Sequence, residues 1–130
     1  MKSKLFLFIF ASIFLISLAQ ATSVSSTLLF HETTENTLTI IDGNSFGISF
    51  SGNSLGEASM TASIIIYNSF GELISTPFEI TTSENSFYFN EVLEDFVYDG
   101  ADQYKIIARV TGSSGNTDSE TLYLIVLPNI

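Results

Sequence analysis

The chain has 130 residues, 45% of them hydrophobic, with fourteen Asp and Glu, four Lys and Arg, one His and no Cys. This inventory excludes thiol catalysis, thiolate metal sites and disulfide staples. Its acidity also argues against nucleic acid as a ligand, because a phosphate backbone is bound by clustered Lys and Arg.

The first 21 residues have the pattern of a secretory signal peptide. Lys2 and Lys4 precede an apolar run over residues 5–18, and Ala19-Gln20-Ala21 has the small-x-small form after which signal peptidase cleaves. A retained membrane anchor is the alternative, but spanning a bilayer takes about 20 apolar residues. We therefore expect a signal peptide over 1–21, a secreted or cell-surface location, and no membrane attachment after cleavage.

Cleavage leaves residues 22–130, which is the size of one domain. It also removes two of the four basic residues, so fourteen carboxylates face only Lys105 and Arg109, a formal net charge of −12. We interpret this acidity as a source of solubility. A specific role in binding cations or a basic partner is the alternative.

The hydrophobic pattern of the mature chain has a period of two, which predicts strands. Enrichment in Ile, Val, Thr, Phe and Tyr favours strands in each run. Turn sequences rich in Gly, Asn, Asp and Ser separate the runs at intervals too short for helical crossovers. A single helical turn over residues 90–96 is the one departure that we consider. In chain order the predicted strands are 27–31, 38–41, 46–51, 60–67, 73–80, 87–90, 104–110 and 122–126.

Short strands at this spacing predict an all-β fold, an antiparallel Greek-key β-sandwich of about seven strands. The stretch from Asp99-Gly100 through Tyr104 to Gly115-Asn116, followed by the apolar run at 122–126, resembles the closing F–G hairpin of the immunoglobulin-like superfamily. This is similar to the fibronectin type III and cadherin-like modules of exported microbial surface proteins. The resemblance implies that Tyr104 is a corner tyrosine, whose ring caps the core and whose hydroxyl bonds nearby backbone.

The sequence departs from antibody-type domains at three positions. Ile106 stands two residues after the corner tyrosine, where those domains have Cys, and the facing strand offers Ile48. Ile64 occupies the place of their Trp. These departures argue against an antibody-type domain, and the resemblance carries over no catalytic residue.

Catalytic and metal-binding chemistry is sparse. We interpret His31 as a surface residue at a strand end rather than a base or ligand, because no nucleophile or partner accompanies it, and we expect no enzymatic activity and no cofactor. Carboxylates gather before the strand at 104–110, where oxygen ligands suit calcium but the spacing matches no calcium loop. A solvated acidic loop and a weak structural calcium site both remain open there. The calcium ligands would be Glu94, Asp95, Asp99 and Asp102.

Alternation also predicts a contact surface. If the even-numbered residues of 60–66 and 104–110 face the core, an apolar and aromatic strip carrying both remaining cations faces outward. Contiguous exposed apolar area often marks contacts. The alternatives are that the segment 22–36 covers this strip, or that its exposed Ile and Tyr have no role. The candidate interface comprises Ile65, Tyr67, Lys105, Ile107, Arg109, Tyr123 and Ile125.

The sequence thus predicts an exported, non-catalytic immunoglobulin-like module with a structural or adhesive role through protein contacts, with copies of itself among the candidate partners. One route to assembly is donation of the segment 25–30 to a sheet edge of the next subunit. The alternative is a secreted module that binds calcium or carbohydrate, with Tyr67 and Tyr123 as stacking surfaces.

Overall fold

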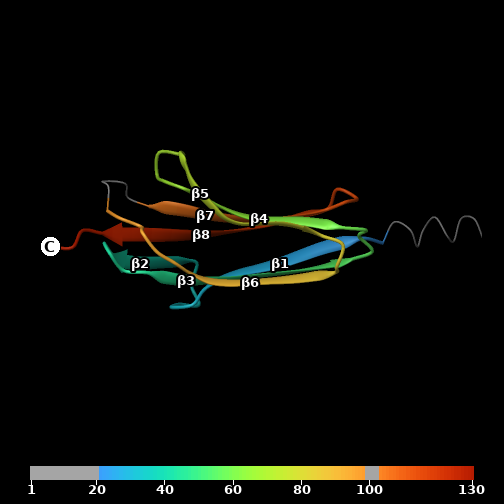
Figure 1. The fold of residues 1–130 in the computed structure, drawn as a ribbon, viewed down its shortest axis with the longest axis horizontal. Helices are drawn as coiled ribbons and strands as arrows, with labels where there is room; N and C mark the ends of the chain where they lie inside the picture. Colours follow the sequence, from blue (N-terminus) through green and yellow to red (C-terminus); the bar gives the residue numbers. More distant parts are fainter. Residues whose placement is uncertain (1–20, 99–102) are drawn as a thin grey trace, which may run out of the picture.

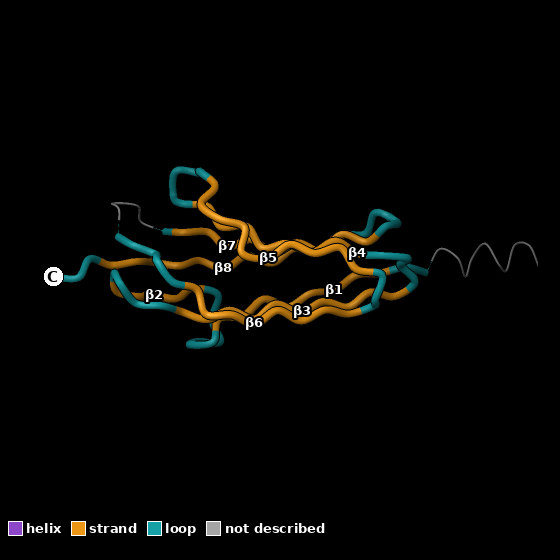
Figure 2. Tube along the Cα trace, viewed as in Figure 1, coloured by secondary structure: helices purple, strands orange, loops and turns teal. Residues whose placement is uncertain are grey.

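The computed structural model describes residues 21–98 and 103–130, which form two facing β-sheets (Figure 1). In this part of the chain there is no helix (Figure 2), and so none long and apolar enough to cross a membrane. The strands are β1 (Ser23–Phe30), β2 (Thr37–Ile41), β3 (Phe46–Leu55), β4 (Met60–Tyr67), β5 (Leu73–Thr82), β6 (Ser86–Leu93), β7 (Tyr104–Gly112) and β8 (Thr117–Leu127).

The two sheets have the strand orders β1-β3-β6 and β2-β8-β7-β4-β5. This arrangement confirms the predicted all-β, immunoglobulin-like sandwich, in which β7 and β8 form the closing hairpin. Residues 21–98 and 103–130 form eight strands rather than about seven, and one pair, β2 with β8, is parallel rather than antiparallel. The parallel pair arises because the chain crosses from one sheet to the other between β1 and β2, which places β2 beside β8. There the Tyr123 amide donates to the Asn36 carbonyl at 2.8 Å.

The core lies between the sheets and follows the predicted alternation. The even-numbered residues of β4 and β7 are buried, and Phe46, Ile48 and Phe50 of β3 are at most 1% exposed. Phe78 from the five-stranded sheet contacts Phe50 and Phe89 of the other sheet, with ring centroids 6.1 and 4.6 Å apart. Aromatic side chains therefore join the two layers directly.

The helical turn predicted over residues 90–96 is wrong. Strand β6 continues to Leu93, which pairs with Phe46 of β3. The chain then turns at Asp95, whose φ of 70° lies in the left-handed region that Asp tolerates better than most residues. This turn returns Phe96 to the core, where its ring lies 5.2 Å from Phe46 and 5.5 Å from Tyr104. Burial of the Phe96 ring thus stabilises this turn rather than a helical turn.

Two carboxylates, those of Glu57 and Asp118, form hydrogen bonds between segments that are far apart in the sequence. Glu57, between β3 and β4, accepts hydrogen bonds from the Ser114 hydroxyl at 2.5 Å, the Ser114 amide at 2.9 Å and the Asn116 side chain at 2.9 Å. The Ser114 bonds are the main cause that lowers the pKa of Glu57 from its ordinary value. Asp118 of β8 accepts from the Ser26 amide and hydroxyl, both at 2.8 Å, which ties β1 to the opposite sheet.

Candidate interaction surface

The seven residues of the candidate interface lie on the outer face of the five-stranded sheet, where β8, β7 and β4 are neighbours. The strand register places Tyr123, Lys105 and Tyr67 in one row across the three strands. Ile107 lies opposite Ile65 in the next row. We call these seven residues the contact face. Its apolar and aromatic members are half-buried, and its two cations are exposed.

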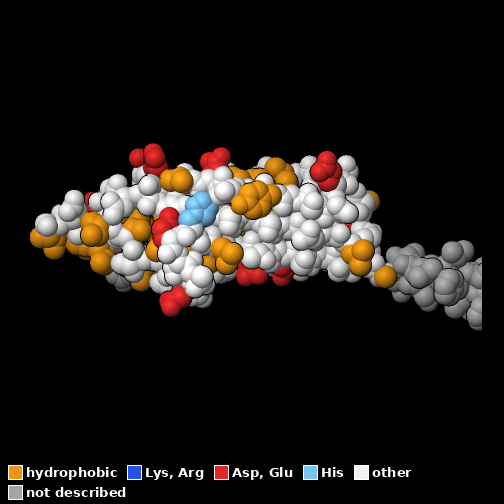
Figure 3. Space-filling view, turned by 90° about the horizontal axis from the view of Figure 1, so that it is seen from below, with side chains coloured by type: hydrophobic (Ala, Val, Ile, Leu, Met, Phe, Trp, Pro, Cys, Tyr) orange, Lys and Arg blue, Asp and Glu red, His pale blue; other side chains and the backbone are white. Residues whose placement is uncertain are grey.

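The charge of the contact face differs from that of the rest of the chain. Lys105 and Arg109 are the only basic residues after the predicted signal peptide, and alternation along β7 puts both on this face. The opposite side of the sandwich, the outer face of the three-stranded sheet, shows acidic but no basic side chains in the described residues visible in Figure 3. The two basic residues of the described chain therefore lie together on one face of a strongly acidic molecule.

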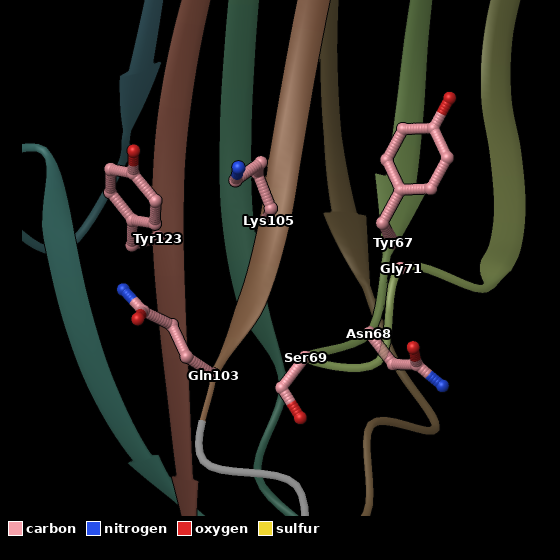
Figure 4. Close-up of a pocket in the computed structure, with 7 residues that line it drawn as sticks. All are labelled: Tyr67, Asn68, Ser69, Gly71, Gln103, Lys105 and Tyr123. Atoms are coloured by element: carbon pink, nitrogen blue, oxygen red, sulfur yellow. The ribbon is translucent and has the colours of Figure 1, made fainter.

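A pocket of about 330 Å³ lies at one end of the contact face. Tyr67 and Tyr123 flank Lys105 on three adjacent strands, and Gln103 and Ser69 complete the pocket below them (Figure 4). The two phenol rings offer flat apolar surfaces, and the lysine between them offers a positive charge. This arrangement suits a ligand that combines a flat or apolar face with a carboxylate.

The turn between β4 and β5 extends this surface. The sequence predicts a turn here, but the candidate interface did not include its exposed apolar residues. The Asn68 side-chain oxygen accepts from the Phe70 and Glu72 amides at 3.0 and 2.9 Å, and Gly71 adopts a φ of 80°. This turn stands away from the sandwich (Figure 2). Three apolar side chains are exposed on it and directly after it. They are Phe70 at 71%, Leu73 at 60% and Ile74 at 45% exposure, and we call them the hairpin tip.

The hairpin tip is continuous with the contact face, because Leu73 pairs with Tyr67 in the strand register. A signal for it was present in the sequence. Phe70 lies within Asn68-Ser69-Phe70-Gly71, a turn of otherwise polar and small residues, and a large apolar residue in a turn has no core to enter. Exposure of such a side chain at a rigid turn favours a role in contacts.

The segment 22–36 does not cover the contact face, so that alternative is wrong. Residues 23–30 form β1, which pairs along its whole length with β3 in the opposite sheet. Leu28 and Phe30 of β1 are 4% exposed and fill the core. Donation of the segment 25–30 to another subunit would therefore require this pairing to break, and the structure has it formed within one chain.

The remaining predicted residues lie as follows. The Tyr104 hydroxyl donates to the Val97 carbonyl at 3.0 Å, seven residues upstream, and its ring is buried. His31 is exposed directly after β1. Glu94 and Asp95 are exposed, whereas Asp99 and Asp102 lie outside the described residues. Within residues 21–98 and 103–130 no three His, Asp or Glu side chains form a group that could hold a metal ion.

Comparison with known proteins supports the fold and does not identify a family. No protein-family model matches the sequence, and a search of curated proteins finds no match. Among solved structures, the BIgI domain of beta protein from S. agalactiae, bound to CEACAM1, is similar with a TM-score of 0.54 and 10% identity over 83% of this chain and 100% of that one. A Niemann-Pick type C2 protein from Japanese carpenter ant has a TM-score of 0.51 and 7% identity, over 82% of this chain and 92% of that one. At such identities the likeness shows the fold alone, an immunoglobulin-like β-sandwich; the fibronectin type III and cadherin-like resemblance stays a prediction.

Proposed function

We propose that this chain is an exported, non-catalytic immunoglobulin-like module that binds a protein partner through the contact face and the hairpin tip. The observation that carries the proposal is the position of Lys105 and Arg109, the two cations of the mature chain, within an apolar and aromatic strip on one exposed sheet face. Interfaces combine aromatic residues and Arg at their centre with a polar rim. A partner with apolar side chains and carboxylates fits this face.

Two further considerations support a contact role over a catalytic one. The described side chains bring together no nucleophile, base and acid, because His31 lies outside the contact face and the pocket. A domain of the same fold, the BIgI domain, is described as bound to the protein CEACAM1. The immunoglobulin-like sandwich is therefore compatible with protein recognition, although fold alone assigns no partner.

The proposal is tested by binding of labelled residues 22–130 to the surface of the producing cells. The double substitution Lys105→Ser and Arg109→Ser removes two positive charges, and we expect binding about 3- to 30-fold weaker, from up to about 1 kcal/mol for each exposed charge. A matched control, Thr27→Glu with Asn53→Glu, changes the net charge equally on the exposed outer face of the other sheet. Equal loss in both variants would mean that net charge, not the contact face, governs binding.

Export and self-association need separate measurements. Mass spectrometry of the protein recovered outside the cell should give an N-terminus at Thr22, and a chain retained with its leader would contradict the export proposal. Sedimentation velocity over a range of concentrations tests assembly. A species whose association responds to the Lys105 and Arg109 substitutions would identify a second copy as the partner, whereas a monomer at all concentrations would restrict the proposal to other proteins.

Carbohydrate binding is the second candidate, and the pocket between Tyr67 and Tyr123 favours it. The aromatic rings would stack on a sugar, and Lys105 would select a saccharide that carries a carboxylate. Treatment of the cells separates the candidates. Protease treatment should abolish binding to a protein partner and leave binding to a polysaccharide intact. Glycosidase treatment should do the reverse, and a glycan panel would then identify the sugar.

A further inference from the structure

The outer edge of β6 carries a row of main-chain groups with no strand beside it in the described part of the chain. The Ser54 amide donates to the Asn85 carbonyl at 2.8 Å, which sets the phase of the antiparallel pairing between β3 and β6. The odd-numbered residues of β6 therefore bond to β3, and the N–H and C=O groups of the even-numbered ones point away. These outward residues, all exposed, are Ser86, Tyr88, Asn90 and Val92.

The other three sheet edges carry features that block the addition of a strand. β5 contains Pro77 and two register shifts against β4. β1 has its outward Ser26 amide bonded to Asp118, and β2 has only five residues. Proline, bulges, side-chain caps and short length are the usual protections of an edge strand. β6 has eight residues in uninterrupted register, without Pro or Lys, so it is the least protected edge among residues 21–98 and 103–130.

The charges around β6 select the kind of strand that fits. Glu84, Glu91 and Glu94 lie on the strand or at its two ends, and no Lys or Arg occurs anywhere between residues 5 and 104. An added strand with Lys or Arg opposite Glu91 gains a favourable cross-strand pair, whereas an acidic strand meets like charge. Tyr88 at 68% and Val92 at 57% exposure provide apolar contacts on the outer face for alternate side chains of the same strand.

A second copy of this chain fits the edge poorly. The two-fold antiparallel pairing that uses all four outward residues places Ser86 opposite Val92 of the other copy and Tyr88 opposite Asn90. Continuing that register brings Glu84 opposite Glu94 of the other copy twice, and like charges directly opposite are destabilising. Both copies also carry the formal charge of −12. The edge thus discriminates against its own chain.

We propose that the β6 edge binds an extended segment of a partner protein that alternates apolar and basic residues, adding a fourth strand to the three-stranded sheet. Main-chain hydrogen bonds to the outward residues supply affinity, and Glu91 together with the surface of Tyr88 and Val92 supplies specificity. This site lies on the other sheet from the contact face, so its test is independent of the function proposed above.

The test uses two synthetic extended peptides that alternate Val or Thr with Lys in one case and with Glu in the other. Added to the full mature chain, the lysine peptide should slow hydrogen exchange of the Ser86, Tyr88, Asn90 and Val92 amides, while those of Phe87 and Phe89 are already protected by β3. The glutamate peptide should bind more weakly. Glu91→Lys should shift the preference toward the glutamate peptide by about two- to fivefold.

A proline pair provides the matched control. Asn90→Pro removes one outward N–H of β6 without breaking a bond to β3, and we expect peptide binding to weaken at least about tenfold. In β2, the Asp42 amide donates to the Leu127 carbonyl at 2.8 Å, so the even-numbered residues bond to β8 and the Thr39 N–H points outward. Thr39→Pro therefore removes an equivalent group from another edge and should leave binding unchanged.

Several outcomes overturn the proposal, and two of them need no variant. Protection that appears on another strand of the wild-type chain would place the peptide elsewhere. Equal binding of the two peptides would remove the selection by charge. Equal weakening by both proline substitutions would remove the role of β6. A dimer that Asn90→Pro dissociates would show that a second copy, not a basic strand, occupies the edge.

Discussion

Replacing Tyr104 with Phe tests how much one hydroxyl contributes to the fold. The ring is 4% exposed, and its edge-to-face contact with Phe96, at 5.5 Å between centroids, survives the substitution. The change removes the donor of the 3.0 Å hydrogen bond to the Val97 carbonyl. That bond connects the start of β7 to the segment that follows β6, across the turn that begins at Asp95.

The magnitude follows from the burial of the two partners. A neutral hydrogen bond contributes about 0.5–1.5 kcal/mol net, because folding exchanges it for bonds to water. Val97 is 52% exposed, so water can reach this segment and solvate the carbonyl that the substitution leaves unpaired. We therefore expect Tyr104→Phe to cost about 0.5–1 kcal/mol, the lower half of that range. A loss of about 1 kcal/mol lowers the melting temperature of a domain of this size by roughly 4–8 °C. Truncation to Ala should cost about 3–5 kcal/mol, as for other buried aromatic side chains.

The assay is thermal unfolding followed by circular dichroism, with chemical denaturation as a second measure of the free energy. Tyr88→Phe is the matched control, because its ring is 68% exposed and the loss of that hydroxyl should change stability by less than about 0.5 kcal/mol. If both Phe variants melt with the wild-type chain while Tyr104→Ala is strongly destabilised, the ring stabilises the fold and the corner hydrogen bond does not. The reasoning about Val97 would then be refuted.

Three further substitutions test the ties at the ends and in the three-stranded sheet. The folded-state pKa of Glu57 is lowered from its ordinary 4.5, so the stability that its carboxylate contributes is present above that value and is lost as pH falls through the folded pKa. The wild-type chain should therefore have a higher melting temperature than Glu57→Gln at pH 7. This difference in melting temperature should vanish in acid. Asp118→Ala removes the carboxylate oxygen that accepts from both the Ser26 amide and the Ser26 hydroxyl, so we expect a loss of about 1–3 kcal/mol and faster hydrogen exchange in β1. Gly52→Ala places a methyl group against the ring of Phe87, and denaturant titration should show a loss of about 1–3 kcal/mol.

The sequence predicted the central strands well and the polar ones only in part. In β4 and β7 the strict alternation of apolar residues defines both the strand and its buried face, so the contact face could be assigned before the structure. β1 begins at Ser23 rather than at residue 27, and β8 begins at Thr117 rather than at 122. These extensions are rich in Ser, Thr and Asp, which also form turns, so their hydrophobic period is weak. Pairing with a neighbour decides their conformation, and one sequence does not reveal the neighbour.

The order of the strands and the hairpin tip depend on tertiary contacts that the hydrophobic pattern of one sequence does not reveal. β2 has the composition of any short strand, and its parallel pairing with β8 follows from the crossing of the chain between the sheets. The Asn68 side chain holds the turn that exposes Phe70, but an Asn in a turn sequence is too common to predict this geometry. Strands with one buried face could thus be predicted from their residue pattern. Strand order and turn geometry could not, because tertiary contacts decide between arrangements that the sequence pattern leaves equivalent.

The absence of cysteine is consistent with the way in which aromatic rings connect the layers. Phe78 from β5 lies 6.1 Å from Phe50, 5.8 Å from Phe87 and 4.6 Å from Phe89, so one ring of the five-stranded sheet contacts two strands of the other. An aromatic side chain buries about 150–250 Å², which at about 25 cal/mol per Å² is at most about 4–6 kcal/mol. A native disulfide in a small secreted domain contributes about 2–5 kcal/mol. A few inter-sheet rings therefore match what a cross-sheet disulfide would add, and the fold does not depend on an oxidising environment for its core.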